Sequence, residues 1–291
     1  MQLNTGSTPK QFIHPVDYSS KEMPSIRNRL SQKLRQRDMF TSLALGSVVA
    51  FLVQGTGAGT LYLSQILFAR WMGPVEYGGY AFAFSWAQLL AALSGLGFTT
   101  GVLRFIPQYL SGRDWERLRG VIFRSRQLTF LTGVVIAAIG TLVLLLLQPR
   151  TFNTVTLVLG MLLVPLFASL NLHMEMLRGT RHIALAYAPP MLLQPILATG
   201  AGFLILRATG TLTSVYTMSV VVMAFLIALV AQVLSLKHVL PKEAAHLPPT
   251  YETAEWLRIS FPLLLVEGFA IVLKRADILM IGMFIGQEEA G

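Results

Sequence analysis

Long apolar segments dominate the chain, and charged residues gather in the stretches between them. A helix needs about 20 consecutive apolar residues to cross the hydrocarbon core of a bilayer. Six segments without any charge are long enough, and a seventh, residues 260–284, is apolar but holds four charges. The pattern therefore predicts seven transmembrane helices, near residues 41–69, 79–104, 128–147, 154–176, 183–206, 213–235 and 260–284.

The composition supports this interpretation. Of the 291 residues, 54% are hydrophobic and only 13% are charged, which is about half the charged share of a soluble globular chain. These values argue against a disordered chain and against a water-soluble enzyme. The chain has no cysteine, so disulfides, thiolate chemistry and cysteine-type zinc sites are excluded. The predicted fold class is an all-α polytopic membrane protein.

The positive charges lie mainly on one side of the predicted membrane. The net charge is +9, and 18 of the 23 Lys and Arg residues fall on the side of the N-terminus. Arg70, Arg150 and Arg207 lie on the opposite side. Because Lys and Arg are enriched in cytoplasmic segments, the N-terminus is predicted to be cytoplasmic. An anionic inner leaflet accounts for the basic charge, so no nucleic acid partner is expected.

Residues 1–38 are predicted to form a cytoplasmic basic tail. They contain no continuous apolar run of the kind that a signal peptide needs. Apolar residues recur in this tail at helical spacing, with Lys and Arg between them, which favours an amphipathic helix on the membrane surface over an unstructured tail. A second amphipathic helix is predicted to begin near Trp115 and to lead into the third span. The apolar positions in the tail are Met23, Ile26, Leu30 and Leu34.

Small residues and prolines interrupt several predicted spans. Gly55 with Gly59 and Gly97 with Gly101 form GxxxG pairs, a spacing that lets helices approach closely in lipid. Proline favours kinks, and both residue types are also common in ordinary membrane helices, so hinges and plain packing stay open as alternatives. Prolines inside or at the ends of spans are Pro165, Pro189, Pro190, Pro195 and Pro262.

Two short segments indicate an internal repeat. Residues 73–78 read GPVEYG, and residues 286–291, 213 positions later, read GQEEAG. Both follow a helix predicted to run outward, which favours two parallel six-helix repeats over a chance match. Because the chain ends where the second repeat begins, we expect it to be a truncated part of a longer protein. The predicted organisation is a tail at 1–38, a first repeat at 39–236, a cytoplasmic linker at 237–259 and the start of a second repeat at 260–291.

Several motifs follow one another in a distinctive order. Residues 63–110 contain an apolar helix, a G-P-x-E-Y-G elbow, a second helix with a small-residue break, and then Arg104 before an aromatic residue. This order resembles polysaccharide flippases of the multidrug/oligosaccharidyl-lipid/polysaccharide superfamily. Two further segments share the resemblance: residues 175–187, which resemble the family's turn between helices 4 and 5, and residues 261–291, which hold an Asp before an apolar run. The resemblance spans most of residues 40–291. It implies the first six-helix half of a MATE-like fold plus helix 7 of the second half.

The resemblance implies a transporter rather than an enzyme. Such proteins move an undecaprenyl-pyrophosphate-linked oligosaccharide, a precursor of polysaccharide or O-antigen (lipopolysaccharide), across the bacterial inner membrane by alternating access. A charged, hydroxyl-rich head group is too costly to pass through hydrocarbon unaided. The implied partners are the lipid-linked oligosaccharide, membrane lipids, and the polysaccharide polymerase or ligase machinery. No cofactor is implied, and transport is expected to be coupled to an H+ or Na+ gradient.

The seventh helix carries the main candidate site residues. Its four charges fall within an arc of about 160° on a helical wheel, and intramembrane charges usually face a wet cavity or the bundle interior. Lys274 and Arg275 are predicted to bind the anionic head group, and Glu267 and Asp277 to couple an ion or to pair with them. The alternative is a structural Lys274–Asp277 pair, with Arg275 reaching to the membrane interface.

Other candidates lie in the first repeat. Arg104, at the predicted inner end of the second span, either binds substrate or anchors the helix to lipid phosphate. Glu76 is predicted to cap the start of the second helix, and the elbow residues Gly73, Pro74 and Gly78 are predicted to be structural. No metal site is predicted, because His173 and His182, near Glu175, are nine residues apart and have no fourth ligand.

Three other functions stay open. A cation-coupled drug antiporter of the same superfamily should line its cavity with carboxylates, of which the first half offers little apart from Glu267. A membrane enzyme acting on polyprenyl-linked sugars is expected to carry large outer loops, whereas the outer loops here are predicted to be short. A purely structural subunit is the third alternative.

Overall fold

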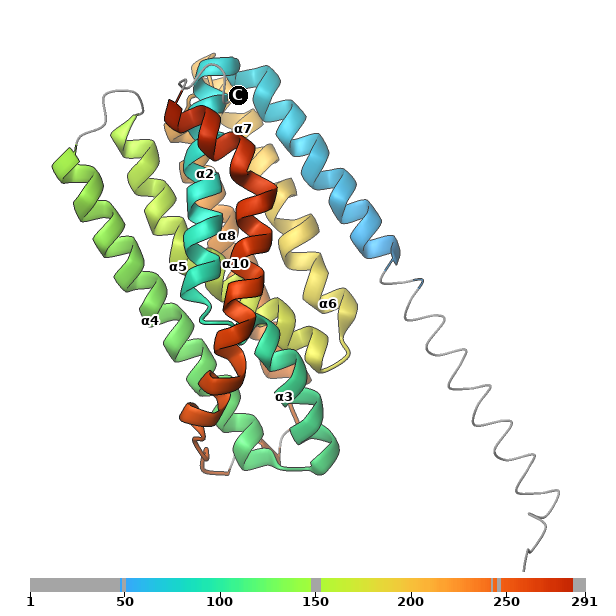
Figure 1. Ribbon diagram of the computed structural model, residues 1–291. Coiled ribbons are helices and arrows are strands. Elements are labelled where there is room, and N and C mark those ends of the chain that lie inside the picture. The colour runs from blue at the N-terminus through green and yellow to red at the C-terminus, as the bar shows by residue number, and fades with distance from the viewer. Residues whose placement is uncertain (1–47, 49–50, 148–152, 242, 245–246, 285–291) are drawn as a thin grey trace, which may run out of the picture. The chain divides into compact units, whose positions relative to one another are not determined.

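The computed structural model describes residues 48, 51–147, 153–241, 243–244 and 247–284, and these residues are mostly helical (Figure 1). Contacts divide the chain into two units, Met1–Gly46 and Ser47–Gly291, and every described residue belongs to the second. The helices, in chain order, are residues 51–72, α2 (Pro74–Ser94), α3 (Phe98–Gly112), α4 (Trp115–Leu147), α5 (Thr154–Gly179), α6 (Ile183–Ala188), the π-helical turn η1 (Pro189–Leu193), α7 (Gln194–Thr209), α8 (Ser214–Val239) and α10 (Thr253–Phe284).

Several of these helices are suited to a bilayer. Within the described residues, α4, α5, the run Ile183–Thr209 and α8 are long and apolar enough to cross a membrane, and α2 with α3 passes the same test as one bent span. Only 6% of the most apolar window of α4 is buried inside the protein, against 61% for α5. An apolar surface of this extent is stable only in lipid. The predicted all-α polytopic membrane fold is confirmed, while the count of seven spans stays a prediction.

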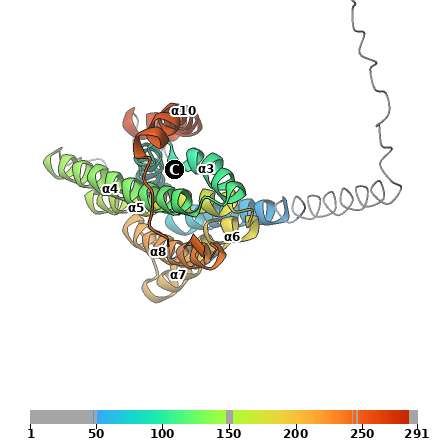
Figure 2. The ribbon, with the colours of Figure 1, turned by 90° about the horizontal axis from the view of Figure 1, so that it is seen from below.

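Helix α5 lies at the centre of the bundle. It packs against α2, α3, α4 and α8, and Figure 2 shows α3 and α10 on one side of it and α7 and α8 on the other. Small residues let the neighbours come close. An added Cβ at Gly160 of α5 would lie 3.1 Å from the carbonyl oxygen of Ala83 in α2, and one at Gly133 of α4 would lie 2.9 Å from Pro165 of α5. This dense central packing makes α5 the scaffold for the surrounding helices.

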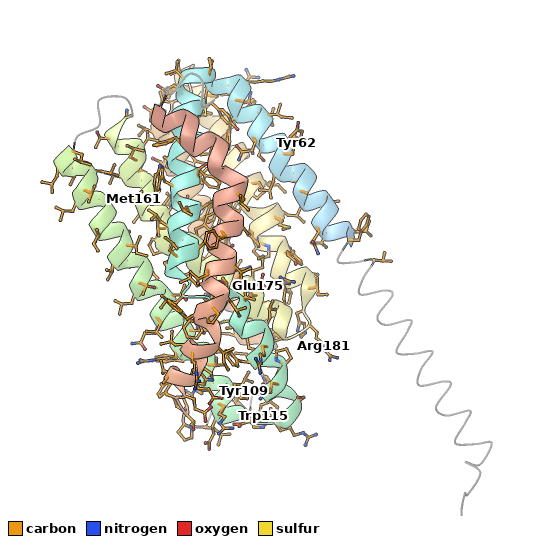
Figure 3. The ribbon with its side chains drawn as sticks, in the orientation of Figure 1. Tyr62, Tyr109, Trp115, Met161, Glu175 and Arg181 are labelled. Atoms are coloured by element: carbon orange, nitrogen blue, oxygen red, sulfur yellow. The ribbon has the colours of Figure 1, made fainter. Side chains whose placement is uncertain are left out.

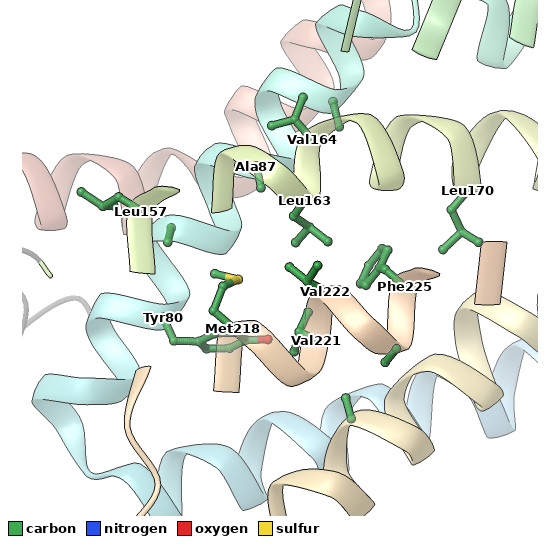
Figure 4. Close-up of a cluster of buried hydrophobic side chains, with 14 of the residues drawn as sticks. Tyr80, Ala87, Leu157, Leu163, Val164, Leu170, Met218, Val221, Val222 and Phe225 are labelled. Carbon is green, nitrogen blue, oxygen red and sulfur yellow. The ribbon is translucent and has the colours of Figure 1, made fainter. Parts of the chain in front are cut away.

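Two clusters of buried apolar side chains hold the helices together. The first joins α2, α5 and α8, and Figure 4 shows Tyr80, Leu163 and Phe225 as members of it. The second joins α3, α4, α5 and α10. In that cluster the indole nitrogen of the buried Trp256 donates a hydrogen bond to the hydroxyl of Tyr109 at 3.0 Å, which fixes the start of α10 to α3.

The second predicted span is broken in its middle. Helix α2 ends at Ser94, and α3 leaves it at an angle of 46°. Gly97 at the break has a φ of 73°, a conformation that glycine adopts without strain. A Cβ at Gly97 would lie 1.9 Å from the carbonyl oxygen of Ser260 in α10. The carbonyl of Ser94, freed by the break, accepts a hydrogen bond from Thr132 of α4 at 2.6 Å. The predicted break and the close packing at Gly97 and Gly101 are confirmed.

Several predicted helix ends are wrong. The span predicted at 79–104 begins at Pro74 and continues to Gly112, so Arg104 lies within α3 and not at its end. Helix α4 begins at Trp115, because the predicted amphipathic stretch runs directly into the span, and α10 likewise begins before the apolar segment. A charged residue marks where a segment leaves hydrocarbon, whereas its helix can continue into the interface.

Two sequence predictions lie outside the described residues. They are the amphipathic helix of the N-terminal tail, within residues 1–38, and the repeat segment at 286–291. Both stay predictions, as do the domain boundaries at 38/39, 236/237 and 259/260.

Candidate functional site

A cavity of about 550 Å³ lies between the 51–72 helix, α2, α5, α8 and the start of α7. The described residues of its wall include no Asp, Glu, Lys, Arg or His, so this wall differs from the cationic site expected on the seventh helix. Aromatic side chains in the wall are Tyr62, Phe68, Tyr77, Tyr80, Phe84, Phe167 and Phe225. Polar side chains in the wall are Ser64, Gln65, Ser85, Gln88, Asn171 and Gln194.

Some polar groups of this wall have no partner in the protein. The Oγ of Ser85 is buried without a hydrogen bond. The side chains of Asn171 and Gln194 make no hydrogen bond to any described residue. By contrast, Gln65 accepts a hydrogen bond from the hydroxyl of Tyr77 at 3.0 Å. Because polar groups inside proteins are normally paired, the amides of Asn171 and Gln194 are available to water or to a polar ligand, whereas the Oγ of Ser85 has no exposed surface.

A π-helical turn shapes one side of the cavity. Pro189 and Pro190 lack a backbone N–H, and the turn that they begin closes with the N–H of Gln194 bonded to the carbonyl of Pro189. A widened turn therefore lies at the prolines for which the sequence favours a kink. It brings Met191 against the 51–72 helix, where a Cβ at Gly57 would lie 2.6 Å from Met191. Gly57, rather than the predicted pair at 55 and 59, makes the close approach within the described residues.

The candidate residues of the seventh helix fall in α10. Its backbone is helical through positions 267, 274, 275 and 277, but the side chains of Glu267, Lys274, Arg275 and Asp277 lie outside the described residues. Their roles stay predictions. Arg104 is exposed on α3, does not line the cavity, and forms no ion pair with a described residue.

The predicted elbow is present, and it is tighter than expected. Gly73 has a φ of 75° and separates the 51–72 helix from α2 by one residue. Pro74 occupies the first turn of α2, where a missing N–H costs nothing. Gly78 is buried. Glu76 lies in the first turn of α2, as expected, but its Oε2 accepts the backbone N–H of Ser214 at 2.6 Å. The expectation that Glu76 caps α2 is therefore wrong, because it binds the N-terminal end of α8 instead.

Replacing Glu76 with glutamine is expected to destabilise the protein by about 1 kcal/mol. The carboxylate makes a charge-assisted hydrogen bond and faces the positive end of the α8 dipole. The measurement is the thermal unfolding midpoint of the purified protein in detergent. Glu255→Gln is the control, since Glu255 is exposed in the first turn of α10 without an ion pair in the described part of the chain. Equal shifts in both variants would contradict this role.

The two histidines singled out in the sequence are held by nearby backbone. The Nδ1 of the buried His173 lies 2.7 Å from the carbonyl oxygen of Ser169, and that of His182 lies 2.9 Å from the carbonyl oxygen of Thr180. Among the described residues, no three His, Asp or Glu side chains gather as metal ligands do. These contacts give both histidines a structural explanation.

One end of the bundle is strongly basic. This end is formed by the start of α4 and the ends of α3, α5 and α8. Figure 3 shows Tyr109, Trp115 and Arg181 near it. Arg70 and Arg207 are the only described cations at the opposite end, and they lie beside the Trp71–Phe203 ring contact. The charge bias expected from the sequence is thus present in space. The cations at the basic end are Arg113, Arg117, Arg119, Arg124, Arg126, Arg178, Arg181, Lys237 and Arg258.

Sequence reasoning missed the residues that form the cavity. Gln65, Gln88, Asn171 and Gln194 are uncharged polar residues inside long apolar runs, and polar residues within spans are a signal of buried sites. A search limited to charges passes over them.

Comparison with known proteins identifies the family. The family of polysaccharide biosynthesis proteins matches the chain over residues 43–291. A search of curated proteins finds no match. The family match covers most of the chain and includes every helix that forms the cavity. The chain therefore belongs to the polysaccharide biosynthesis protein family.

Proposed function

We propose that this protein is a flippase that moves an undecaprenyl-pyrophosphate-linked oligosaccharide across the bacterial inner membrane, with sugar units entering the uncharged cavity. The observation that carries the proposal is the cavity wall, which combines aromatic rings with amides and hydroxyls and has no charged side chain among its described residues. Sugars combine apolar C–H faces with many hydroxyls, which suit such a wall. The volume of about 550 Å³ is within the usual range for small-molecule sites.

The same wall argues against a cationic drug as the substrate. A cation that leaves water needs a carboxylate or another strong acceptor, and the described lining of the cavity holds no Asp or Glu. A neutral sugar loses only hydrogen bonds to water, which the amides of Asn171 and Gln194 can replace. The cavity thus favours saccharide transport over drug export.

The proposal includes an orientation and a mode of action. The basic end of the bundle faces the cytoplasm, because Lys and Arg are retained on that side, and the N-terminus then lies inside. The polyprenyl tail stays in lipid while the head group passes through the protein by alternating access. Coupling to an H+ or Na+ gradient, and delivery of the product to a polymerase or ligase, belong to this proposal. It involves no cofactor and no enzymatic step.

Removing both cations of α10, Lys274→Ala with Arg275→Ala, is expected to lower transport at least about tenfold. Hydrogen bonds to a charged partner contribute about 1.5–3 kcal/mol each, and the proposed partner is the pyrophosphate. The measurement is the amount of lipid-linked saccharide retained on the cytoplasmic face. Arg113→Ala with Arg258→Ala, which removes two exposed cations of the basic end, is the control. Unchanged transport in the α10 variant would assign these residues a structural role.

The decisive experiment for the function is depletion of the gene in its host with sugars radiolabelled. We expect lipid-linked saccharide to accumulate on the cytoplasmic face and to reach the outer face again when the wild-type gene is restored. Normal appearance on the outer face together with new drug sensitivity would contradict the proposal in favour of an antiporter. Failure to make or to join the lipid-linked saccharide would contradict it in favour of an enzyme.

A further inference from the structure

A second pocket, of about 470 Å³, opens at the basic end of the bundle between α4 and the end of α8. It shares no residue with the cavity described above. Of the nine described residues that line it, three are basic, six are apolar and none is acidic. They are Leu118, Arg119, Ile122, Phe123, Arg126, Lys237, Leu240, Pro241 and Ala244.

The pocket exists because α4 and α8 do not pack on each other. Both pack on α5 and make little contact with one another, and Figure 2 shows them at different sides of α5. The positions of Arg119, Ile122 and Arg126 are three, four and seven residues apart, so they share one face of α4. Lys237 belongs to the last turn of α8. Cations from two separate helices therefore border one opening.

Two cations of this pocket, Arg126 and Lys237, have no acidic partner among the described residues. Arg126 is half-buried, Lys237 is exposed, and neither forms an ion pair with a described residue. Elsewhere at this end, Arg117 pairs with Glu252 at 2.8 Å and Arg178 pairs with Glu175 at 2.7 Å. A half-buried cation without a partner is unfavourable, so an anion in the pocket would stabilise this end.

Two other charged residues bear on the charge of the pocket: Arg119, which is part of its wall, and Glu243, which is not. Arg119 donates a hydrogen bond to the carbonyl oxygen of Leu247. Glu243 is exposed and is not part of the wall, although it adjoins Ala244 in the sequence. The pocket thus keeps a net positive wall.

We propose that this pocket binds an anionic phospholipid, with the phosphate between Arg126 and Lys237 and an acyl chain along Phe123. The apolar part of the wall favours a lipid over free phosphate, because six apolar residues offer nothing to a small hydrated anion. Phe123 is 55% exposed, on a helix whose surface is suited to lipid. Basic pockets between helices at the membrane surface suit anionic head groups. The bound lipid fastens α4 to α8 and acts independently of the transported substrate.

The test is lipid binding by the full chain purified in detergent, counted by native mass spectrometry. The probes are palmitoyl-oleoyl phosphatidylglycerol, phosphatidylcholine with the same chains, and inorganic phosphate. We expect selective retention of phosphatidylglycerol, and about thirtyfold weaker binding in Arg126→Gln with Lys237→Gln, since each cation near the membrane surface contributes about fivefold. The control is Arg113→Gln with Arg181→Gln, which removes two exposed cations at the same end and should bind as the wild type does.

The exposed position of Lys237 keeps the test decisive if the double variant does not fold. Lys237→Gln alone is expected to weaken phosphatidylglycerol binding about fivefold. Equal losses in the pocket and control variants would overturn the proposal in favour of general surface charge. Equal retention of phosphatidylcholine, or displacement of the lipid by inorganic phosphate, would overturn the assignment to an anionic phospholipid.

Discussion

Replacing Gly97 with alanine is expected to prevent α10 from packing against the break between α2 and α3. The added carbon would lie 1.9 Å from the carbonyl oxygen of Ser260 and 3.0 Å from the backbone nitrogen of Leu264. Both atoms belong to helix backbone, so neither can rotate away. Alanine in the left-handed conformation costs about 1–2 kcal/mol, and overpacking adds about 1–3 kcal/mol. The sum is a large part of the stability of a typical domain.

The thermal unfolding midpoint and the yield of folded protein in membranes measure this effect. Gly59→Ala is the control, because Gly59 also belongs to a GxxxG pair but lies within a helix and has no described atom within 4 Å of an added Cβ. We expect a marked fall in both quantities for the Gly97 variant and little change for the Gly59 variant. A Gly97 variant as stable as the Gly59 variant would show that α10 does not depend on this close approach.

The contrast between these two glycine pairs shows what the sequence can predict about the fold. Apolar length and charge placement predict a helical membrane protein, and the break at Gly97 follows from clustered small residues. The GxxxG pattern cannot say whether a neighbour exists, since that depends on helices distant in the chain. Gly97 meets Ser260 of α10, while Gly59 meets no described neighbour. Helix ends are mispredicted for a related reason, because α4 continues from Trp115 through the interface without a break.

The candidate site was harder to predict from the sequence than the fold was. Charges inside spans are rare and conspicuous, so Lys274 and Arg275 stand out in the sequence. The cavity depends instead on neutral residues from α2, α5 and α7, such as Asn171 and Gln194, which meet only after folding. Glu76 shows the same limit. Its place in the first turn of α2 was predictable, whereas its bond to Ser214, 138 residues away, was not.

Replacing Asn171 and Gln194 together with leucine is expected to reduce saccharide transport about a hundredfold while leaving the protein stable. Each amide removed would leave a sugar hydroxyl unpaired, at a cost of about 1–3 kcal/mol, and 1.4 kcal/mol corresponds to a factor of ten. In the folded protein neither amide has a described hydrogen-bond partner to lose. Leucine has a similar volume and suits the apolar neighbours. Transport is measured by the appearance of lipid-linked saccharide on the outer face, and stability by the thermal midpoint.

A buried amide outside the cavity provides the opposite control. Gln232 is buried in α8 and donates a hydrogen bond to the carbonyl oxygen of Ala186 at 3.0 Å, and it does not line the cavity. Gln232→Leu should leave that carbonyl unpaired and lower stability by about 1–3 kcal/mol, without a specific loss of transport per folded molecule. If the cavity variant instead lost stability and kept its transport rate, Asn171 and Gln194 would be structural residues, and the sugar would have to pass through another part of the protein.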